Sequence, residues 1–316
     1  MKAAVITSFD EPPAAAEFAE PTGGDGQVAC DVAVAAVNPV DLLIASGRFY
    51  AAVPELPSVA GREGIARFAD GTLAYFDSPL PPFGSMAERT LLPEGSWRVL
   101  PEGLEPASAL ACGIAGLAAY LSLTARARMK AGERVLVLGA GGAVGQVGLV
   151  AARQLGAGRV VGAARGEASL QRASDLGADA TVSLTGSRDE IASSIAEAFD
   201  GEGPDVVIDP LWGTPAEAAV QSMAFAGRLV QLGRSAGDSA TFDSAAIRGK
   251  CLQVLGHTNF ANSPDEKGAA LDVMFGWARE GVLDVKHEVL GLDSIAEAWT
   301  RQAAGPGLKL LIDPRA

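Results

Sequence analysis

A cluster of glycines between residues 138 and 148 has the spacing of a phosphate-binding turn. The stretch LGAGGAVGQVG follows an apolar run directly and opens a long amphipathic segment. Glycines in such a turn let the backbone approach a pyrophosphate closely, and the free N–H groups of the following helix stabilise its charge. The spacing GxGGxxG departs from the strict GxGxxG, so the prediction depends on the flanking strand and helix. The residues predicted to contact a dinucleotide are Gly139, Ala140, Gly141, Gly142, Ala143, Val144 and Gly145.

The end of the next apolar run discriminates between nicotinamide cofactors. NAD sites usually place an acid there for the ribose 2'-hydroxyl, whereas NADP sites place a cation there for the 2'-phosphate. In this chain the run ends AARGE, with Ala164 near the position of the acid and Arg165 beside it. Glu167 lies farther along and is expected to open the next helix, where the helix dipole favours it. The sequence therefore predicts NADPH, with an ordinary surface arginine as the alternative reading of Arg165.

Charged and polar residues near the N-terminus form a second candidate group. Residues 58 to 66, SVAGREGIA, hold Arg62 and Glu63 between two glycines in an otherwise apolar stretch. We expect Arg62 to be paired with Glu63 or Asp41. Direct contact with a ligand is the alternative, because clefts collect such charges. Asp41 is expected to orient a loop or a helix start rather than to act as a base.

The elements that position these residues follow from the apolar pattern after residue 133. Continuous apolar runs alternate with helical stretches that begin near residues 142, 168, 188, 214 and 244. Continuous rather than alternating runs are typical of strands covered on both faces. The pattern therefore predicts an α/β fold with a doubly wound parallel sheet. The runs are 134–138, 159–164, 180–184, 205–209, 228–232 and 251–255.

The two ends of the chain have a different pattern. Residues 1 to about 115 are rich in short strands, turns and prolines, and the segment after residue 257 returns to mixed structure. In that segment we predict a helix over 265–280, the strand KHEVL, the helix SIAEAWTRQ and a final strand LKLLI. We predict three parts: 1–115, 116–257 and 258–316.

Composition excludes several classes of partner. The formal charge of -13 disfavours contact with nucleic acid or anionic lipid. The uncharged stretch 107–125 is rich in Ala and Gly, and we interpret it as two buried helical pieces cut by Gly113 and Gly116 rather than a membrane span. The N-terminus has no signal-peptide core, so we expect a cytoplasmic protein. Three scattered cysteines and two histidines make a Cys/His zinc site improbable.

These residues occur in pieces that together resemble a known family. The chain resembles the zinc-independent quinone oxidoreductases, which are relatives of zeta-crystallin in the medium-chain dehydrogenase/reductase superfamily. The matching pieces occur in the same order as in that family. The resemblance extends over nearly the whole chain, which makes it more specific than any single motif. The matching pieces are NPVD (38–41), SGRFY (46–50), LPSVAGREG (56–64), GSMAE (84–88), ACGIAGLAAY (111–120), the glycine loop, LGAD (176–179), DVVID (205–209), GRLVQLG (227–233) and LKLLI (308–312).

The resemblance implies a GroES-like catalytic domain completed by the C-terminal segment, a Rossmann domain and a homodimer. Zinc-dependent relatives carry a catalytic Cys where this chain has Asn38 or Val40, and Gly-His-Glu where it has Gly61, Arg62 and Glu63. No zinc ligand set is therefore expected, because an arginine does not ligate zinc at any accessible pH. Asp41 and Arg62 are assigned to the substrate pocket.

The resemblance also suggests roles for individual residues. Asn38 is placed beside the nicotinamide, and the alternative is that it only forms a turn. Tyr50 is our candidate hydrogen-bond donor to the substrate oxygen, and the alternative is an aromatic residue at the rim that packs on the substrate without chemistry. Asp209 is expected to orient the loop after its strand, and Lys309 to be a solvated surface lysine or to approach the cofactor. A proton-donor role for His257 is less expected than a structural one. The further residues assigned to the cofactor are Leu232, Gly233, Arg234, His257 and Thr258.

The leading functional hypothesis is an NADPH-dependent reductase of quinones or α,β-unsaturated carbonyls that works without metal. The enzymatic alternative is an enoyl-thioester or polyketide-type enoyl reductase, which uses the same hydride chemistry on an acyl chain. The non-enzymatic alternative is an NADPH-binding sensor or structural protein.

Overall fold

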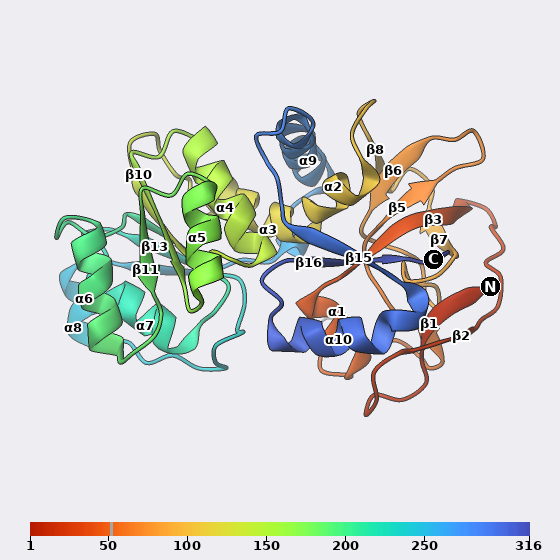
Figure 1. Cartoon of the computed structure of the whole chain (residues 1–316), viewed down its shortest axis with the longest axis horizontal. Coiled ribbons are helices and arrows are strands. Elements are labelled where there is room, and N and C mark those ends of the chain that lie inside the picture. The colour runs from red at the N-terminus through yellow and green to blue at the C-terminus, as the bar shows by residue number, and fades with distance from the viewer. Residues whose placement is uncertain (51–52) are drawn as a thin grey trace. The chain divides into compact units, whose positions relative to one another are not determined.

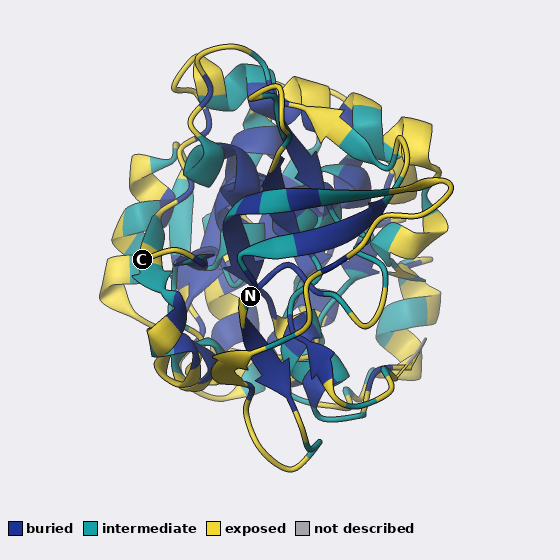
Figure 2. Cartoon of the chain, turned by 90° about the vertical axis from the view of Figure 1, so that its right-hand side faces the viewer, coloured by how far each residue is buried: buried dark blue, intermediate teal, exposed yellow. Residues whose placement is uncertain are grey.

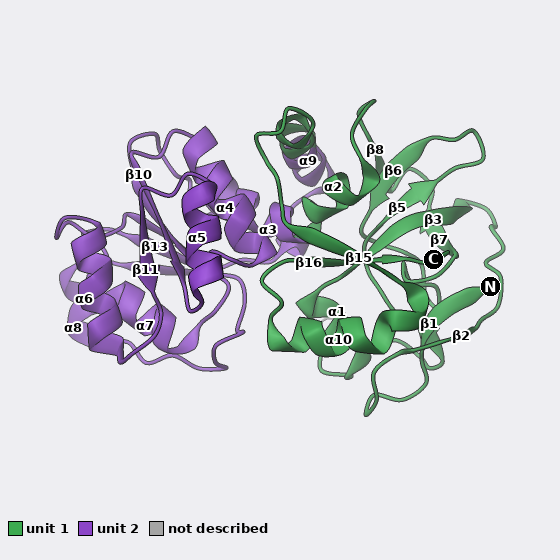
Figure 3. Cartoon of the chain, in the orientation of Figure 1, with its two compact units in different colours: residues 1–114, 272–316 green, residues 115–271 purple. Residues whose placement is uncertain are grey.

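The structure, a computed structural model, describes residues 1–50 and 53–316 and divides the chain into two compact units. Unit 1 contains Met1–Ile114 and Asp272–Ala316, and unit 2 contains Ala115–Leu271 (Figure 3). Unit 1 is thus built from both ends of the chain. Figure 1 shows this directly, because elements drawn in blue at the C-terminal end lie among those drawn in red at the N-terminal end.

Unit 1 consists mainly of short strands. They are β1 (Lys2–Ile6), β2 (Ala14–Glu17), β3 (Gln27–Val37), β4 (Ser58–Val59), β5 (Gly64–Arg67), β6 (Leu73–Phe76), β7 (Arg89–Pro93), β8 (Trp97–Val99), β15 (His287–Gly291) and β16 (Lys309–Asp313). The helices of this unit are α1 (Pro39–Ala45), α2 (Pro106–Ala111) and α10 (Ile295–Ala304). A longer helix, α9 (Pro264–Arg279), begins in unit 2 and ends in unit 1.

The C-terminal strands complete the main sheet of unit 1. Its order is β15-β16-β3-β5-β6-β8, with β7 also paired to β3. Antiparallel pairing of β16 with β3 sets Leu310 opposite Val37 and Ile312 opposite Ala35. A separate small sheet has the order β2-β1-β4. Most strands of this unit are largely buried, but β2 is exposed and β8 and β15 are exposed or half-buried; exposed residues gather in the loops (Figure 2).

The core of unit 1 lies between this sheet and helices α1 and α10. Trp299 of α10 packs there with Ile6, Phe76 and Leu310, each of which is at most 7% exposed. Fully burying a side chain of this size stabilises the fold by about 1.5–3 kcal/mol. The apolar stripe of the helix SIAEAWTRQ, predicted from the sequence, is therefore the part that docks against the sheet.

Unit 2 alternates strands and helices. Its strands are β9 (Arg134–Leu138), β10 (Arg159–Ala164), β11 (Ala180–Ser183), β12 (Val206–Asp209), β13 (Arg228–Gln231) and β14 (Gln253–Gly256). Its helices are α3 (Ile114–Leu121, whose first residue belongs to unit 1), a π-helical turn (Ser122–Arg126), α4 (Ala143–Gln154), α5 (Glu167–Asp175), α6 (Arg188–Ala198), α7 (Gly213–Ser222) and α8 (Ser244–Gly249).

The strands of unit 2 form a parallel sheet in the order β11-β10-β9-β12-β13-β14. Numbered from β9 this is 3-2-1-4-5-6, the order of a Rossmann fold. Because the strands are parallel, the carboxyl ends of β9, β10, β12, β13 and β14 lie at one edge of the sheet. The predicted fold class, a Rossmann sheet with a second β-rich domain, is confirmed.

Two details differ from the sequence expectation. The first division of the chain follows Ile114, next to the predicted residue 115, but the second follows Leu271 rather than residue 257. The intervening segment includes the start of α9, whose helical pattern runs across the division without a break. The stretch 107–125 is helical as expected, but its break lies at Cys112 and Gly113 only, and Gly116 is inside α3.

None of the helices in the described ranges is both long enough and apolar enough to cross a bilayer.

Candidate active site

A buried cluster of polar side chains lies inside unit 1. At its centre is Glu63, whose side chain is fully buried. Its Oε1 accepts hydrogen bonds from Lys309 Nζ at 2.7 Å and from Asn38 Nδ2 at 2.9 Å. Its Oε2 accepts from the Tyr75 hydroxyl at 3.0 Å and from the backbone N–H of Ile114 at 2.6 Å. These donors compensate the carboxylate for its loss of water, and we call the five residues the Glu63 cluster.

Strand pairing explains why residues so distant in sequence meet. Asn38 follows β3 directly, and Lys309 opens β16, so the pairing of Leu310 with Val37 sets Lys309 beside Asn38. Lys309 Nζ donates to Asn38 Oδ1 at 2.5 Å. On the other side of β3, the N–H of Ala36 donates to the carbonyl of Glu63 at 3.2 Å. The sheet register therefore fixes the ion pair between Lys309 and Glu63.

Gly113 lets the chain approach the cluster closely. A Cβ atom at this position would overlap Glu63 Oε2 and would lie 2.6 Å from the ring of Tyr75. A residue with a side chain would therefore push Ile114 away from the carboxylate that its N–H binds. The cluster therefore requires a glycine at this position, which lies in the break between α2 and α3.

Asp41 ties the cluster to its surroundings. Its carboxylate accepts the N–H of Asn38 at 2.7 Å, which closes the first turn of α1, and the N–H of Arg62 at 3.0 Å. The Arg62 guanidinium donates to the carbonyl of Asp77 at 3.0 Å. Arg62 contacts Asp41 through its backbone N–H, and the ion-pair partner of Glu63 is Lys309.

Burial shifts the titration of the acids in this region. Loss of water and the nearby Glu63 charge raise the pKa of Asp41, hydrogen bonds from Asn38 and the Lys309 charge oppose the shift, and the net pKa is about 7. Burial and the Glu63 charge likewise hold the pKa of Tyr75 well above 10. Tyr75 therefore stays protonated and serves as a hydrogen-bond donor.

The structure brings together Asn38, Asp41 and Arg62, three residues that the resemblance assigns to the site. Asn38 is only 3% exposed, and its amide is held between Lys309 and Glu63. Tyr50 is 74% exposed with its ring centroid 4.7 Å from that of Phe49, and it immediately precedes residues 51–52, which lie outside the described ranges.

Sequence reasoning missed two of the side chains in the cluster, Lys309 and Tyr75. The expectation that Lys309 is a solvated surface lysine is wrong, because Lys309 is only 3% exposed. The signal that indicates a buried cation is its position as a lone charge at the start of the apolar run LKLLI. Tyr75 carries no comparable signal, since an aromatic residue in a strand ordinarily packs in a core.

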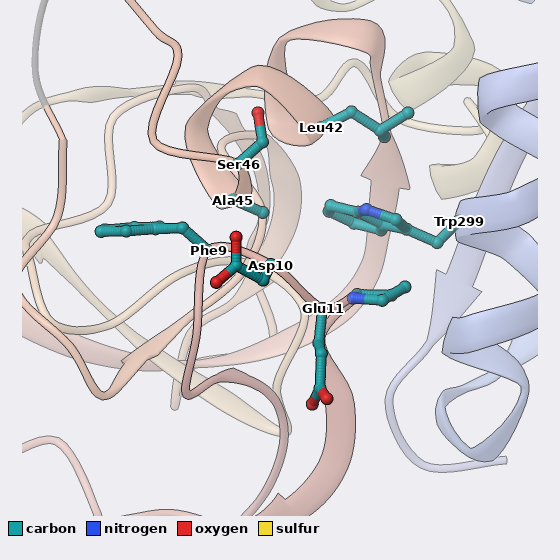
Figure 4. A pocket seen from close by; sticks show the side chains of 8 residues that line it. Phe9, Asp10, Glu11, Leu42, Ala45, Ser46 and Trp299 are labelled. Carbon is teal, nitrogen blue, oxygen red and sulfur yellow. The ribbon is translucent and has the colours of Figure 1, made fainter.

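A separate pocket of about 170 Å³ is lined in part by Leu42 and Ala45 of α1. Figure 4 shows Trp299 and Leu42 on one side of it and Phe9 and Asp10 on the other. No residue assigned to substrate or cofactor from the sequence lines it. The pocket and the Glu63 cluster are therefore distinct features of unit 1.

The glycine loop of unit 2 forms a cradle at the carboxyl end of β9. Gly139 has a φ of 66°, which favours glycine. A Cβ atom on Gly145 would overlap the carbonyl oxygen of Gly139 and would lie 2.6 Å from Ala140 Cα. Gly142 is the N-cap of α4, so the first N–H groups of this helix face the loop. The cradle has the backbone donors and close approach that a pyrophosphate requires.

Buried Gln146 holds this loop in shape, which sequence reasoning did not predict. Its Nε2 donates to the carbonyl of Gly141 at 2.9 Å, and its Oε1 accepts from Arg172 Nε of α5 at 3.1 Å. A Cβ atom on Gly141 would overlap Ser169 of the same helix. The glycine loop is therefore anchored to both of the helices that flank it.

The other predicted cofactor residues lie along the same edge of the sheet. Arg165 follows β10 directly and is exposed, with no ion pair to any other described residue. Leu232 and Gly233 follow β13, and Arg234 is exposed and pairs with Asp238 at 2.6 Å.

His257 and Thr258 follow β14, the last strand of this sheet. The Nε2 atom of His257 lies 3.2 Å from Asn259 Oδ1, and burial lowers the pKa of the imidazole. His257 is therefore neutral at pH 7. Thr258 Oγ1 accepts the N–H of Phe260 at 3.4 Å, which fixes the turn that follows.

In the described part of the chain, no three His, Cys, Asp or Glu side chains are grouped so that they could hold a metal ion.

Comparison with known proteins agrees with this geometry. Residues 143–275 match a family described as zinc-binding dehydrogenase, a match that covers most of unit 2. Quinone oxidoreductase-like protein 2 homolog of Nematostella vectensis is 27% identical over 296 residues, which is 90% of this chain and 80% of that protein. A mycocerosic acid synthase-like polyketide synthase of Mycolicibacterium smegmatis is 30% identical over 228 residues, 69% of this chain but a tenth (10%) of that protein.

Among solved structures, the chain is similar to the quinone oxidoreductase of Thermus thermophilus, which was also determined in complex with NADPH. The TM-score is 0.83 at 28% identity, covering 99% of this chain and 100% of that one.

Proposed function

Because this chain belongs to the quinone oxidoreductases of the medium-chain dehydrogenase/reductase superfamily, we propose that it transfers hydride from NADPH to a quinone or an α,β-unsaturated carbonyl. The observation that carries the proposal is the glycine cradle at Gly139–Gly145, placed at the carboxyl edge of a Rossmann sheet. The close packing of this loop depends on its glycines, since a Cβ atom on Gly141 would overlap Ser169 and one on Gly145 would overlap the Gly139 carbonyl oxygen.

NADPH is preferred over NADH because of Arg165. This residue is exposed immediately after β10, where dinucleotide sites recognise the 2' position of the ribose. Glu167 is the acid that could instead bind the ribose 2'-hydroxyl of NADH. It lies in the first turn of α5, where the helix dipole favours an acidic side chain without any ligand. The complex of the Thermus thermophilus relative with NADPH supports the same choice.

A bound nicotinamide supplies the hydride, so the chain itself has to hold the reactants and stabilise developing charge. In unit 2, the glycine loop and the N-terminus of α4 would hold the pyrophosphate, and Arg165 the 2'-phosphate. In unit 1, Tyr50 would donate a hydrogen bond to the substrate oxygen. The engagement of the Asn38 amide with Lys309 and Glu63 supports a positioning role for Asn38 at the start of α1. The lowered pKa of His257 disfavours it as a proton donor.

A second candidate is the reduction of an enoyl thioester. It is favoured by the similarity to the polyketide synthase of Mycolicibacterium smegmatis, with which this chain shares 30% identity over 228 residues. The hydride chemistry would be unchanged, and the substrate would be an acyl chain on a carrier. The third possibility is a protein that binds NADPH without catalysis, and an experiment has to distinguish it from the two enzymes.

The cofactor is tested by fluorescence titration with NADPH and NADH. The wild type should bind NADPH at least about ten times more tightly, as expected for a charge-assisted contact with the 2'-phosphate. Arg165→Gln should abolish the preference while leaving NADH binding unchanged. Equal affinities in the wild type would contradict the assignment to Arg165.

The substrate class is tested by stopped-flow oxidation of NADPH in the presence of quinones, enones and enoyl thioesters. Turnover with quinones or enones supports the leading proposal, and turnover with enoyl thioesters alone supports the second. Tight NADPH binding with no turnover in any class would assign the chain to the binding proteins.

A further inference from the structure

Asp209 is a fully buried acid that the proposed reaction does not use. It ends β12, and its Oδ1 accepts the N–H groups of Leu211 at 2.9 Å and Trp212 at 2.8 Å. Its Oδ2 is buried and has no hydrogen-bond partner in the described chain. The sequence prediction that Asp209 orients the loop after its strand is thus supported by its contacts, and the buried acid lies at the edge of the sheet that holds the glycine loop.

The loop that Asp209 holds has an unusual backbone. Trp212 has φ 61° and ψ -165°, a region that is essentially restricted to glycine. A residue persists there only when its surroundings over-determine it. The Asp209 carboxylate, which accepts the Trp212 N–H, supplies one such constraint. The packing of the Trp212 ring edge-on against Phe242, at 5.4 Å between centroids, supplies another.

This loop lies between the two segments that we assign to the cofactor. On one side, a Cβ atom on Gly139 would lie 3.1 Å from Leu211 and 3.3 Å from Pro210. On the other side, a Cβ atom on Gly233 would overlap the carbonyl oxygen of Pro210, and the Ala236 N–H donates to the carbonyl of Leu211 at 2.7 Å. If residues 210–212 shifted, they would therefore displace both of these segments.

We propose that Asp209 is a positioning residue for the nucleotide site, which acts by holding Trp212 in its strained conformation and thereby keeping residues 210 and 211 packed against Gly139 and Gly233. The inference rests on the proposed function, because it assigns a nucleotide to these segments. Asp209 touches neither cofactor nor substrate in this scheme.

The protonation state of Asp209 provides a signature of this role. Burial raises its pKa to about 6, while the N–H groups of Trp212 and Leu211 oppose the shift. No charged side chain contributes: Arg234 and Asp238 of the neighbouring loop pair with each other, and Glu217 of α7 binds the N–H of Thr241. An ionised carboxylate is a stronger acceptor than a neutral acid, so the loop is held more firmly above this pKa.

The test is isothermal titration of the full chain with NADP⁺ from pH 5 to pH 8. Asp209→Asn should weaken binding about tenfold at pH 7.5, because the neutral amide oxygen is a weaker acceptor than the carboxylate. It should also remove the part of the pH dependence that arises near pH 6. The 2'-phosphate titrates in the same range, but equally for wild type and variant, so the difference between their profiles isolates Asp209. Asp200→Asn, an exposed acid, is the matched control and should behave as wild type.

A second variant separates positioning from general damage to the fold. Trp212→Gly relieves the strain, so Asp209→Asn should cost much less affinity in this background than in the wild type. An equal loss in both backgrounds, or wild-type affinity and pH profile for Asp209→Asn, would overturn the inference while leaving the proposed function intact. Failure of the wild type and the Asp200→Asn control to bind NADP⁺ at any pH would overturn both.

Discussion

Lys309 brings an ammonium group into the interior of unit 1, where it meets the Glu63 carboxylate. Both side chains are at most 3% exposed, so neither charge is screened by water. Such a pair adds little stability over apolar residues of the same shape, but removing one partner leaves an uncompensated buried charge. The Asn38 amide forms hydrogen bonds to both side chains, so its position also depends on this ion pair.

Lys309→Met should therefore lower the free energy of unfolding by about 3–5 kcal/mol. Urea unfolding followed by circular dichroism measures the change, with exposed Lys2→Met as the control. Adding Glu63→Gln to Lys309→Met removes the unpaired charge and should restore part of the loss. A single Lys309→Met variant as stable as the wild type would show that Glu63 is not charged in the fold.

Asp41 should give the stability of the chain a dependence on pH. Its pKa is about 7 in the fold against an ordinary value of 3.8, so between these values the folded chain keeps a proton that the unfolded chain has lost. The free energy of unfolding therefore falls as pH rises across this window, by about 4 kcal/mol from this group alone. Asp41→Asn should flatten this slope in urea melts at pH 4 to 7.5, whereas exposed Asp25→Asn should preserve it. An unchanged slope in Asp41→Asn would refute the assignment.

At the scale of elements, the glycine loop joins β9 to α4, and its backbone contact at Gly145 leaves no room for a side chain. Gly145 is the tightest point, since its Cβ would overlap the Gly139 carbonyl oxygen. Gly249 of α8 is a matched position with open space around it. The difference between the two glycines isolates the effect of the cradle from the effect of an added methyl group.

Gly145→Ala should force the loop open and weaken NADPH binding by more than about tenfold, with about 1–3 kcal/mol of lost stability from overpacking. Gly249→Ala should leave NADPH binding unchanged and should not lower stability, since Ala is favoured over Gly in a helix by about 0.5–1 kcal/mol. Fluorescence titration and thermal unfolding of the two variants provide the comparison. Wild-type affinity in Gly145→Ala would mean that the nucleotide does not bind at this loop.

The elements that sequence patterns predict best are those with a strong local signal. The run RVLVL and the loop after it have a strand and a helix in the expected places, because continuous apolar residues, glycines and an amphipathic stretch all agree there. Strand β14 departs from the expectation of burial on both faces: its residues are exposed or half-buried, because it lies at the end of the sheet. Periodicity reports the type of an element but not its place in the sheet.

At the scale of the molecule, the sequence predicts which residues belong to the candidate site better than it predicts what they contact. Asn38, Asp41 and Arg62, which the resemblance to a known family assigns to the site, lie together, and their roles stay predictions. The partner of Glu63 lies 246 residues away in the chain, and no local pattern reports so distant a contact. Only the pairing of β3 with β16, which joins the two ends of the chain in the main sheet of unit 1, determines it.

The exposed edge of β14 bears on assembly. This strand pairs with β13 alone in the described chain, and Val254 and the nearby Phe260 are 41% and 54% exposed. Unpaired edges with apolar side chains favour pairing with another chain. We predict a homodimer with twice the 32.1 kDa chain mass in light scattering after size exclusion, and dissociation to monomer in Val254→Asp. A monomeric wild type at micromolar concentration would contradict this.

The central claim, hydride transfer from NADPH to an activated carbonyl compound, is tested most directly with NADPH deuterated at the transferable C4 position. The purified chain is incubated with this cofactor and a simple cyclic enone, and the product is examined by mass spectrometry. Our account predicts a saturated ketone with one deuterium on the β-carbon, and no such product from the Gly145→Ala variant. A product without deuterium, or none from any enone or quinone tested, would contradict it.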